Sequence, residues 1–63
     1  MLVKLREVRQ SKGMTQRVLA EKARMSYVYI SNLENGKANV SLFTLRKLAK
    51  VLKVNVADLV ADE

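Results

Sequence analysis

The stretch TQRVLAEKARMSYVYISNLENGK, residues 15–37, predicts two short helices joined by a tight turn. Thr15 is a good N-cap, because its hydroxyl can accept a hydrogen bond from a backbone N–H at the start of a helix. The apolar residues that follow recur at helical spacing between Gln16 and Ala23. They are Val18, Leu19, Ala20 and Ala23.

Ser26 offers a second N-cap, and the helix after it should bury Ile30 and Leu33. Asn35-Gly36 predicts the end of this helix, because glycine adopts the left-handed conformation cheaply. Met25 lies in the turn between the two helices, where we expect it to fill an apolar gap.

The remaining sequence predicts three further helices, so the fold class is all-α. The first runs from Leu2 to Lys12, ends before Gly13, and is followed by Met14 inserted into the core. A long helix from Leu42 to Leu52, capped by Ser41, should bury one apolar face. That face consists of Leu42, Leu45, Leu48, Ala49 and Leu52.

A short last helix is capped by Asn55, with Asp58 near its positive end. Val56 and Leu59 should close the core. Phe43 lies outside the buried face of the preceding helix, and two positions remain open for it. It either folds under the preceding loop or lies at a contact between subunits.

Composition limits what the protein can do. Its 63 residues allow one domain, 1–63, near the lower size limit for a core without staples. The sequence has no cysteine and no histidine, which excludes a disulfide framework and removes the commonest metal ligands. We therefore expect no metal, no cofactor and no enzymatic activity. No apolar run reaches the roughly 18 residues that span a membrane, and no signal peptide is evident, so a cytoplasmic protein is expected.

The charge is unevenly distributed. The net charge is +6, and all twelve Lys and Arg residues lie within residues 1–53 together with three of the six acids, which gives this segment +9. The other three acids lie in the last six residues. A basic body favours a polyanionic partner, with nucleic acid first, although many small domains are moderately basic.

Two charged residues interrupt the apolar faces. Arg9 follows Val8 and lies four residues after Leu5, and Glu34 has the same relation to Leu33 and Ile30. A buried charge is tolerable only when it is paired and hydrogen-bonded, so we expect Arg9 and Glu34 to meet. The alternative is that both side chains reach solvent separately.

These residues, taken in register, resemble the helix-turn-helix of the Cro and phage-repressor family, the xenobiotic-response-element type of bacterial regulator. The matches within residues 15–37 are Thr15-Gln16, Leu19-Ala20, Ala23, Ser26, Ile30-Ser31 and Leu33-Glu34-Asn35-Gly36. Flanking matches are Arg9, Lys12-Gly13-Met14, Ser41-Leu42, Thr44-Leu45, Lys47-Leu48-Ala49 and Leu52. The resemblance implies a compact five-helix, lambda-repressor-like domain and the pairing of Arg9 with Glu34.

The resemblance also implies base contacts at Tyr27, Val28 and Asn32. At about 100° per residue, Val28 and Asn32 lie opposite buried Ile30, and no charged residue occurs from Met25 to Leu33. Asn32 has the amide for a bidentate contact with adenine, and Val28 can pack on a thymine methyl. The alternative is that the tyrosines pack on neighbouring helices.

Contacts to the DNA backbone are expected at the edges of this face. The family places a phosphate on Gln16, at the positive end of a helix. The full set of expected backbone contacts is Gln16, Arg17, Tyr29, Ser31, Lys37, Asn39 and Ser41. Family members commonly dimerise through the C-terminal region, which here contains Val54, Val56 and Val60.

Arg24 departs from the family pattern, which most often has glycine in the turn because this residue adopts a positive φ. A left-handed arginine costs about 1 kcal/mol, so the turn is either strained or built differently.

The sequence therefore predicts a sequence-specific regulator of transcription, with repression the expected role. It would bind a palindromic operator in double-stranded DNA as a homodimer. The alternative function is a helical protein-interaction module, such as an antitoxin-like domain, that uses the Tyr27–Tyr29 face for another protein.

Overall fold

The computed structural model describes residues 4–60, and these residues form an all-α fold, as the sequence predicts. In chain order the elements are α1 (Leu5–Ser11), α2 (Gln16–Ala23), α3 (Tyr27–Glu34), α4 (Leu42–Leu52) and a 3-10 helix, η1 (Val56–Leu59). None of the helices within these residues is long and apolar enough to cross a lipid bilayer.

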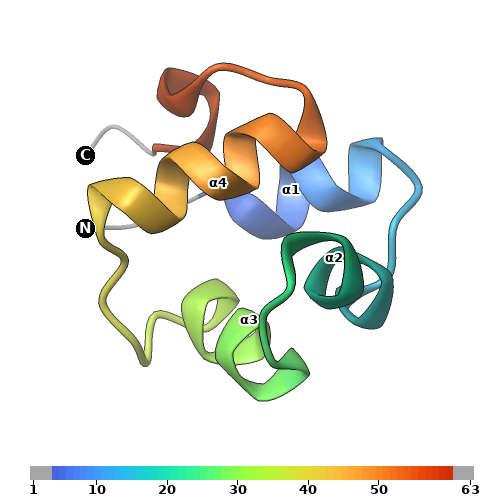
Figure 1. The fold of residues 1–63 in the computed structure, drawn as a ribbon, viewed down its shortest axis with the longest axis vertical. Coiled ribbons are helices and arrows are strands. Elements are labelled where there is room, and N and C mark those ends of the chain that lie inside the picture. Colours follow the sequence, from blue (N-terminus) through green and yellow to red (C-terminus); the bar gives the residue numbers. More distant parts are fainter. Residues whose placement is uncertain (1–3, 61–63) are drawn as a thin grey trace.

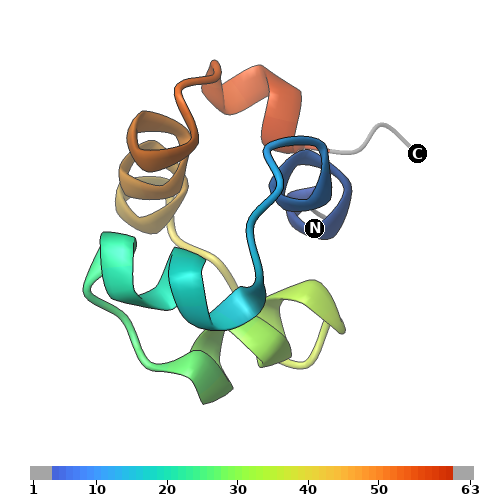
Figure 2. The ribbon, with the colours of Figure 1, turned by 90° about the vertical axis from the view of Figure 1, so that its right-hand side faces the viewer.

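The helices form two levels. The two helices of the predicted helix-turn-helix, α2 and α3, lie together at the bottom of Figure 1, while α1, α4 and η1 lie above them. Figure 2 shows α4 and α1 on opposite sides of the upper level, with η1 spanning its top. Every element therefore faces the same interior.

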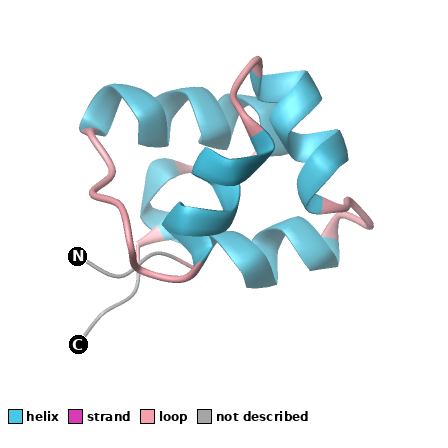
Figure 3. Ribbon diagram, turned by 90° about the horizontal axis from the view of Figure 1, so that it is seen from below, coloured by secondary structure: helices cyan, strands magenta, loops and turns pink. Residues whose placement is uncertain are grey.

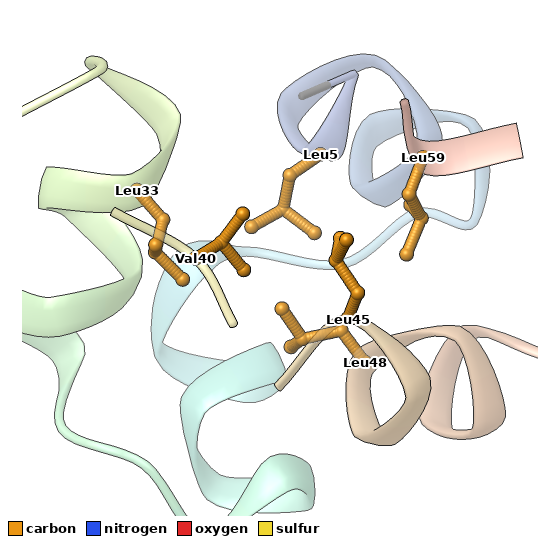
Figure 4. Close-up of a pocket in the computed structure, with 6 residues that line it drawn as sticks. All are labelled: Leu5, Leu33, Val40, Leu45, Leu48 and Leu59. Carbon is orange, nitrogen blue, oxygen red and sulfur yellow. The ribbon is translucent and has the colours of Figure 1, made fainter. Parts of the chain in front are cut away.

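One apolar core fills that interior. Leucines from both levels meet there, and Figure 4 shows Leu5, Leu33, Val40, Leu45, Leu48 and Leu59 pointing toward one another from five segments of the chain. The space between them is too small for a water molecule. The whole buried apolar set is Leu5, Leu19, Ala20, Ala23, Ile30, Leu33, Leu45, Leu48, Ala49, Leu52 and Leu59.

Hydroxyl caps fix where three of the helices begin. Thr15 Oγ1 accepts from the Val18 N–H at 3.1 Å, and Ser26 Oγ accepts from the Tyr29 N–H at 3.0 Å. Ser41 Oγ accepts from the Thr44 N–H at 3.1 Å. Each bond satisfies a backbone donor that the first turn leaves unpaired, so the predicted helix starts are confirmed.

The two ends of the fold differ from the prediction. The first helix begins at Leu5, with Lys4 as its non-helical N-cap, and the Lys4 N–H donates to the Leu59 carbonyl at 2.8 Å. Leu2, the predicted start of this helix, lies outside the described residues. The last element is a four-residue 3-10 helix rather than a fifth α-helix. The Asp58 carboxylate accepts from the Asn55 N–H at 3.0 Å at its start.

The first turn of α4 is also more exposed than predicted. The prediction that Leu42 is buried was wrong, because 56% of it is exposed. Ala49, seven residues later and therefore on the same side of α4, is buried, so Leu42 is exposed because it lies in the first turn of the helix and not because of its angle around the axis. Phe43 is 76% exposed, so it does not fold under the preceding loop.

The turn between α2 and α3 contains a left-handed arginine. Arg24 has φ 56° and ψ 44°, the conformation that usually favours glycine, and its N–H closes the helix by donating to the Glu21 carbonyl. The turn therefore keeps its usual geometry and is strained at Arg24.

The strain at Arg24 predicts that glycine is more stable than alanine at this position, the reverse of their order inside a helix. Arg24→Gly should be more stable than Arg24→Ala by about 1 kcal/mol, because only glycine escapes the left-handed penalty. At Lys22, exposed inside α2, glycine should instead be less stable than alanine by about 1 kcal/mol. Urea unfolding of the four variants measures both differences, and the same sign at both positions would contradict the assigned strain.

Candidate nucleic-acid interface

The outward face of α3 is exposed and uncharged. Val28 is 62% exposed and Tyr27 is 41% exposed, while Ile30 on the opposite side is fully buried. Asn32 lies half-buried on the outward side. Figure 3 views the molecule from the side on which α2 and α3 lie, and no other helix covers α3 there among the described residues.

A buried carboxylate at the end of α3 ties this helix to α1. Arg9 Nε lies 2.6 Å from Glu34 Oε2, and Arg9 Nη2 donates to Glu34 Oε1 at 3.1 Å. The Glu34 side chain has no exposed area, and Arg9 is buried as well. The structure thus brings together the two charges that interrupt the apolar faces, in a bidentate arrangement.

Further donors complete the shell of Glu34. Arg6 Nε lies 3.3 Å from Glu34 Oε1, and Arg6 Nη2 donates to Asn35 Oδ1 at 2.8 Å, although half of the Arg6 side chain is exposed. Arg9 Nη1 also donates to the Met14 carbonyl at 2.7 Å, which fixes the link between α1 and α2. Within residues 4–60, every buried polar side-chain atom has a hydrogen-bond partner.

Gln16 belongs to the same network. Its side-chain Nε2 donates to Glu34 Oε1 at 3.0 Å, so this residue, expected on a phosphate, is held at the first turn of α2 by a buried carboxylate. The carbonyl oxygen of the amide and the second Nε2 hydrogen stay available. The backbone N–H of Gln16 is one of the unpaired donors at the helix start.

The network determines the ionisation of Glu34. Burial raises the pKa of this carboxyl, but hydrogen bonds from Arg9, Gln16 and Arg6 outweigh burial, and the pKa lies below its ordinary value. Glu34 is therefore an anion at neutral pH.

Arg17 and Tyr27 connect the first turns of α2 and α3. The guanidinium carbon of Arg17 lies over the Tyr27 ring, 4.6 Å from its centroid, which is cation–π geometry. The pair borders an open hollow in the surface. Its lining residues are Arg9, Met14, Thr15, Gln16, Arg17 and Tyr27.

The other residues expected on the DNA backbone lie around α3. Tyr29 is half-buried and packs against the core, and the Ser31 hydroxyl accepts from Asn35 at 3.4 Å. Lys37 and Asn39 are exposed in the loop that leads to α4, and the Ser41 hydroxyl caps α4. Tyr29 and Ser31 thus lie on α3 itself, and Lys37, Asn39 and Ser41 follow its C-terminal end.

The three C-terminal valines are partly exposed and partly packed on the core. Val54, Val56 and Val60 are each half-buried and pack against the core. Within residues 4–60, no group of three His, Cys, Asp or Glu side chains is placed to hold a metal ion.

Comparison with known proteins identifies the family. A family model described as helix-turn-helix matches residues 5–59. The chain belongs to the Cro/C1-type helix-turn-helix family. The relatives that it matches include transcriptional regulators, an immunity repressor and control proteins.

Relatives match in both sequence and structure. The transcriptional regulator DdrOP3 of Deinococcus deserti is 43% identical over 56 residues, which cover 89% of this chain and 43% of that protein. The restriction-modification controller C.AhdI of Aeromonas hydrophila is 37% identical with a TM-score of 0.82, covering 86% of this chain and 82% of that one. The clp gene regulator ClgR of C. glutamicum is 44% identical with a TM-score of 0.82, covering 86% and 70%.

These matches confirm the predicted fold class, with a 3-10 helix as the last element. The chain spans less than half the length of the first curated relatives it matches.

Three contacts of the site were missed from the sequence. Arg6 precedes Arg9 by three residues and so lies on the same side of α1, a spacing that could have indicated its bond to Glu34. The Gln16–Glu34 bond and the Arg17–Tyr27 stack depend on the angle between helices, which no sequence pattern specified.

Removal of the buried carboxylate should destabilise the fold strongly. Glu34→Ala should lower the free energy of unfolding by about 3–5 kcal/mol, because it leaves Arg9 buried without its partner. Arg6→Ala removes only a half-exposed donor to the same carboxylate and should lower the free energy of unfolding by about 0–1 kcal/mol. Urea unfolding at pH 7 measures both, and a loss below about 0.5 kcal/mol for Glu34→Ala would contradict a buried pair.

The lowered pKa of Glu34 predicts an acid-dependent loss of stability. Because the unfolded chain, with a pKa near 4.5 for this carboxyl, takes up the proton first, Glu34 stabilises the fold above that pH and loses its effect as the pH falls through the folded-state pKa. The stability difference between the parent protein and Glu34→Gln should therefore shrink between pH 7 and pH 3. Urea unfolding at several pH values measures this difference, and a Glu34→Gln difference that stays constant over this range would refute the linkage.

Proposed function

We propose that this chain is a sequence-specific regulator of transcription that inserts α3 into the major groove of double-stranded DNA. The observation that carries the proposal is the exposed, uncharged outer face of α3, fixed from behind by the buried Glu34 network. Recognition helices of this type place their N-terminal residues against base edges while the preceding helix crosses the backbone.

The base contacts are assigned by side-chain chemistry. The Asn32 amide suits the N6 and N7 edge of adenine, and Val28 suits the methyl group of thymine. Tyr27, the first residue of α3, contacts a neighbouring base through its ring edge or hydroxyl. Exposure of Val28 and Tyr27 supports these contacts, because neither is used to pack the core.

The backbone contacts lie on two sides of that face. Gln16 anchors one side, where the bond to Glu34 holds its side chain beside the unpaired N–H groups of α2. Lys37, Asn39 and Ser41 anchor the other side, with Tyr29 and Ser31 at the edge of α3. These contacts position the protein and carry no sequence information.

A homodimer on a palindromic operator completes the proposal. Two copies related by a two-fold axis place their recognition helices about 34 Å apart, one turn of the duplex. The proposed contact joins Val54, Val56 and Val60 to the exposed first turn of α4, because Leu42 and Phe43 are apolar and more than half exposed. Repression is the proposed role, since an immunity repressor of Bacillus phage phi105 is among the relatives, 35% identical over 60 residues.

The proposal predicts a sequence-dependent effect of Asn32. A duplex is selected from a random pool, and binding is titrated over a range of salt. Asn32→Ala should lose about 1–3 kcal/mol on the selected duplex and nothing on random DNA, because it removes a base contact. The selected duplex should contain two half-sites about 10 base pairs apart.

Lys37→Ala is the matched control, because a phosphate contact should weaken binding equally on all sequences and reduce the slope of log K against log salt by about 0.9. Equal affinity of both variants for every duplex would contradict sequence-specific recognition. A protein-interaction module would show no selected sequence and little dependence on salt.

A further inference from the structure

The stacked pair of Arg17 and Tyr27 presents a charged group at the edge of the α3 face. Both residues are exposed, and within residues 4–60 no carboxylate forms an ion pair with Arg17. A guanidinium that rests on an aromatic ring keeps its in-plane N–H donors free for hydrogen bonding. The pair therefore offers a donor fork that has no ion-pair partner among these residues, with its guanidinium carbon 4.6 Å from the centroid of the Tyr27 ring.

The α3 face itself has no Arg or Lys, the side chains that most commonly contact guanine. Asn32 matches adenine and Val28 matches thymine, whereas the commonest specific contact to guanine is a bidentate Arg or Lys on O6 and N7. Tyr27 is the first residue of α3, where recognition helices face the base edges. A guanidinium held over its ring lies beside the bases that α3 would read.

We infer that Arg17 is a specificity-determining residue that donates two hydrogen bonds to O6 and N7 of a guanine, with Tyr27 as its positioning residue. This inference rests on the proposed function and replaces the backbone role that the sequence indicated for Arg17. A phosphate contact needs only a cation within reach, but bidentate recognition of guanine needs a positioned guanidinium, and the contact with the Tyr27 ring restricts where the Arg17 guanidinium lies.

Base analogues test this contact directly. Each guanine of the selected duplex is replaced in turn by 7-deazaguanine, which lacks the N7 acceptor, and affinities are measured for the parent protein and Arg17→Ala. In the parent, one guanine per half-site should be sensitive, with at least about a fivefold loss. Arg17→Ala should bind the guanine and 7-deazaguanine duplexes equally, while Lys22→Ala, an exposed cation elsewhere on α2, should keep the difference.

Variants of Tyr27 test the positioning role. Tyr27→Phe keeps the ring and should keep the 7-deazaguanine penalty, whereas Tyr27→Leu should reduce this penalty by several-fold. Loss of the other contacts of Tyr27 would instead weaken binding to the guanine and 7-deazaguanine duplexes alike. A uniform loss of affinity for Arg17→Ala on every duplex, with no guanine changing its sensitivity, would overturn the inference and leave the proposed function intact. Failure of the parent protein to select any duplex would overturn both.

Discussion

The fold depends on keeping the Glu34 carboxylate charged although its side chain is fully covered. An isolated anion there would be strongly unfavourable, so the structure must supply donors from several directions. Arg9 and Arg6 come from α1, and Gln16 comes from α2, while Glu34 itself ends α3. Because all donors must be in place at once, one carboxylate sets how three helices meet. Their relative positions are therefore specified more tightly than leucine packing alone would require.

This constraint also determines what α3 can present to a partner. Ile30 and Leu33 hold its inner side, and Glu34 fixes its end, so the outer side is free of any structural task. A helix of eight residues has little stability of its own, and the rigidity of its exposed face comes from contacts behind it. The same carboxylate holds Gln16, so the proposed phosphate anchor and the proposed reading face share one internal support.

The sequence predicted the parts of the fold that depend on local chemistry. The spacing of Leu19, Ile30 and Leu33 located the core, and two charges on apolar faces indicated that Arg9 and Glu34 belong together. The burial of Leu42 was predicted wrongly, because periodicity does not reveal where neighbouring helices stop covering a helix end. The Arg17–Tyr27 stack could not be predicted, because it depends on the angle between α2 and α3. The turn at Arg24 sets that angle, and the sequence left two geometries open for this turn.

The face of α3 that Glu34 supports is the surface that we propose meets DNA. The most direct test is an NMR titration of the nitrogen-15-labelled protein with a selected duplex, in which every backbone amide reports on its surroundings. We expect the largest shift changes at Gln16, Arg17, Tyr27, Val28 and Asn32. Changes concentrated on the outer face of α4, at Arg46 and Lys50, with α3 unaffected, would contradict it.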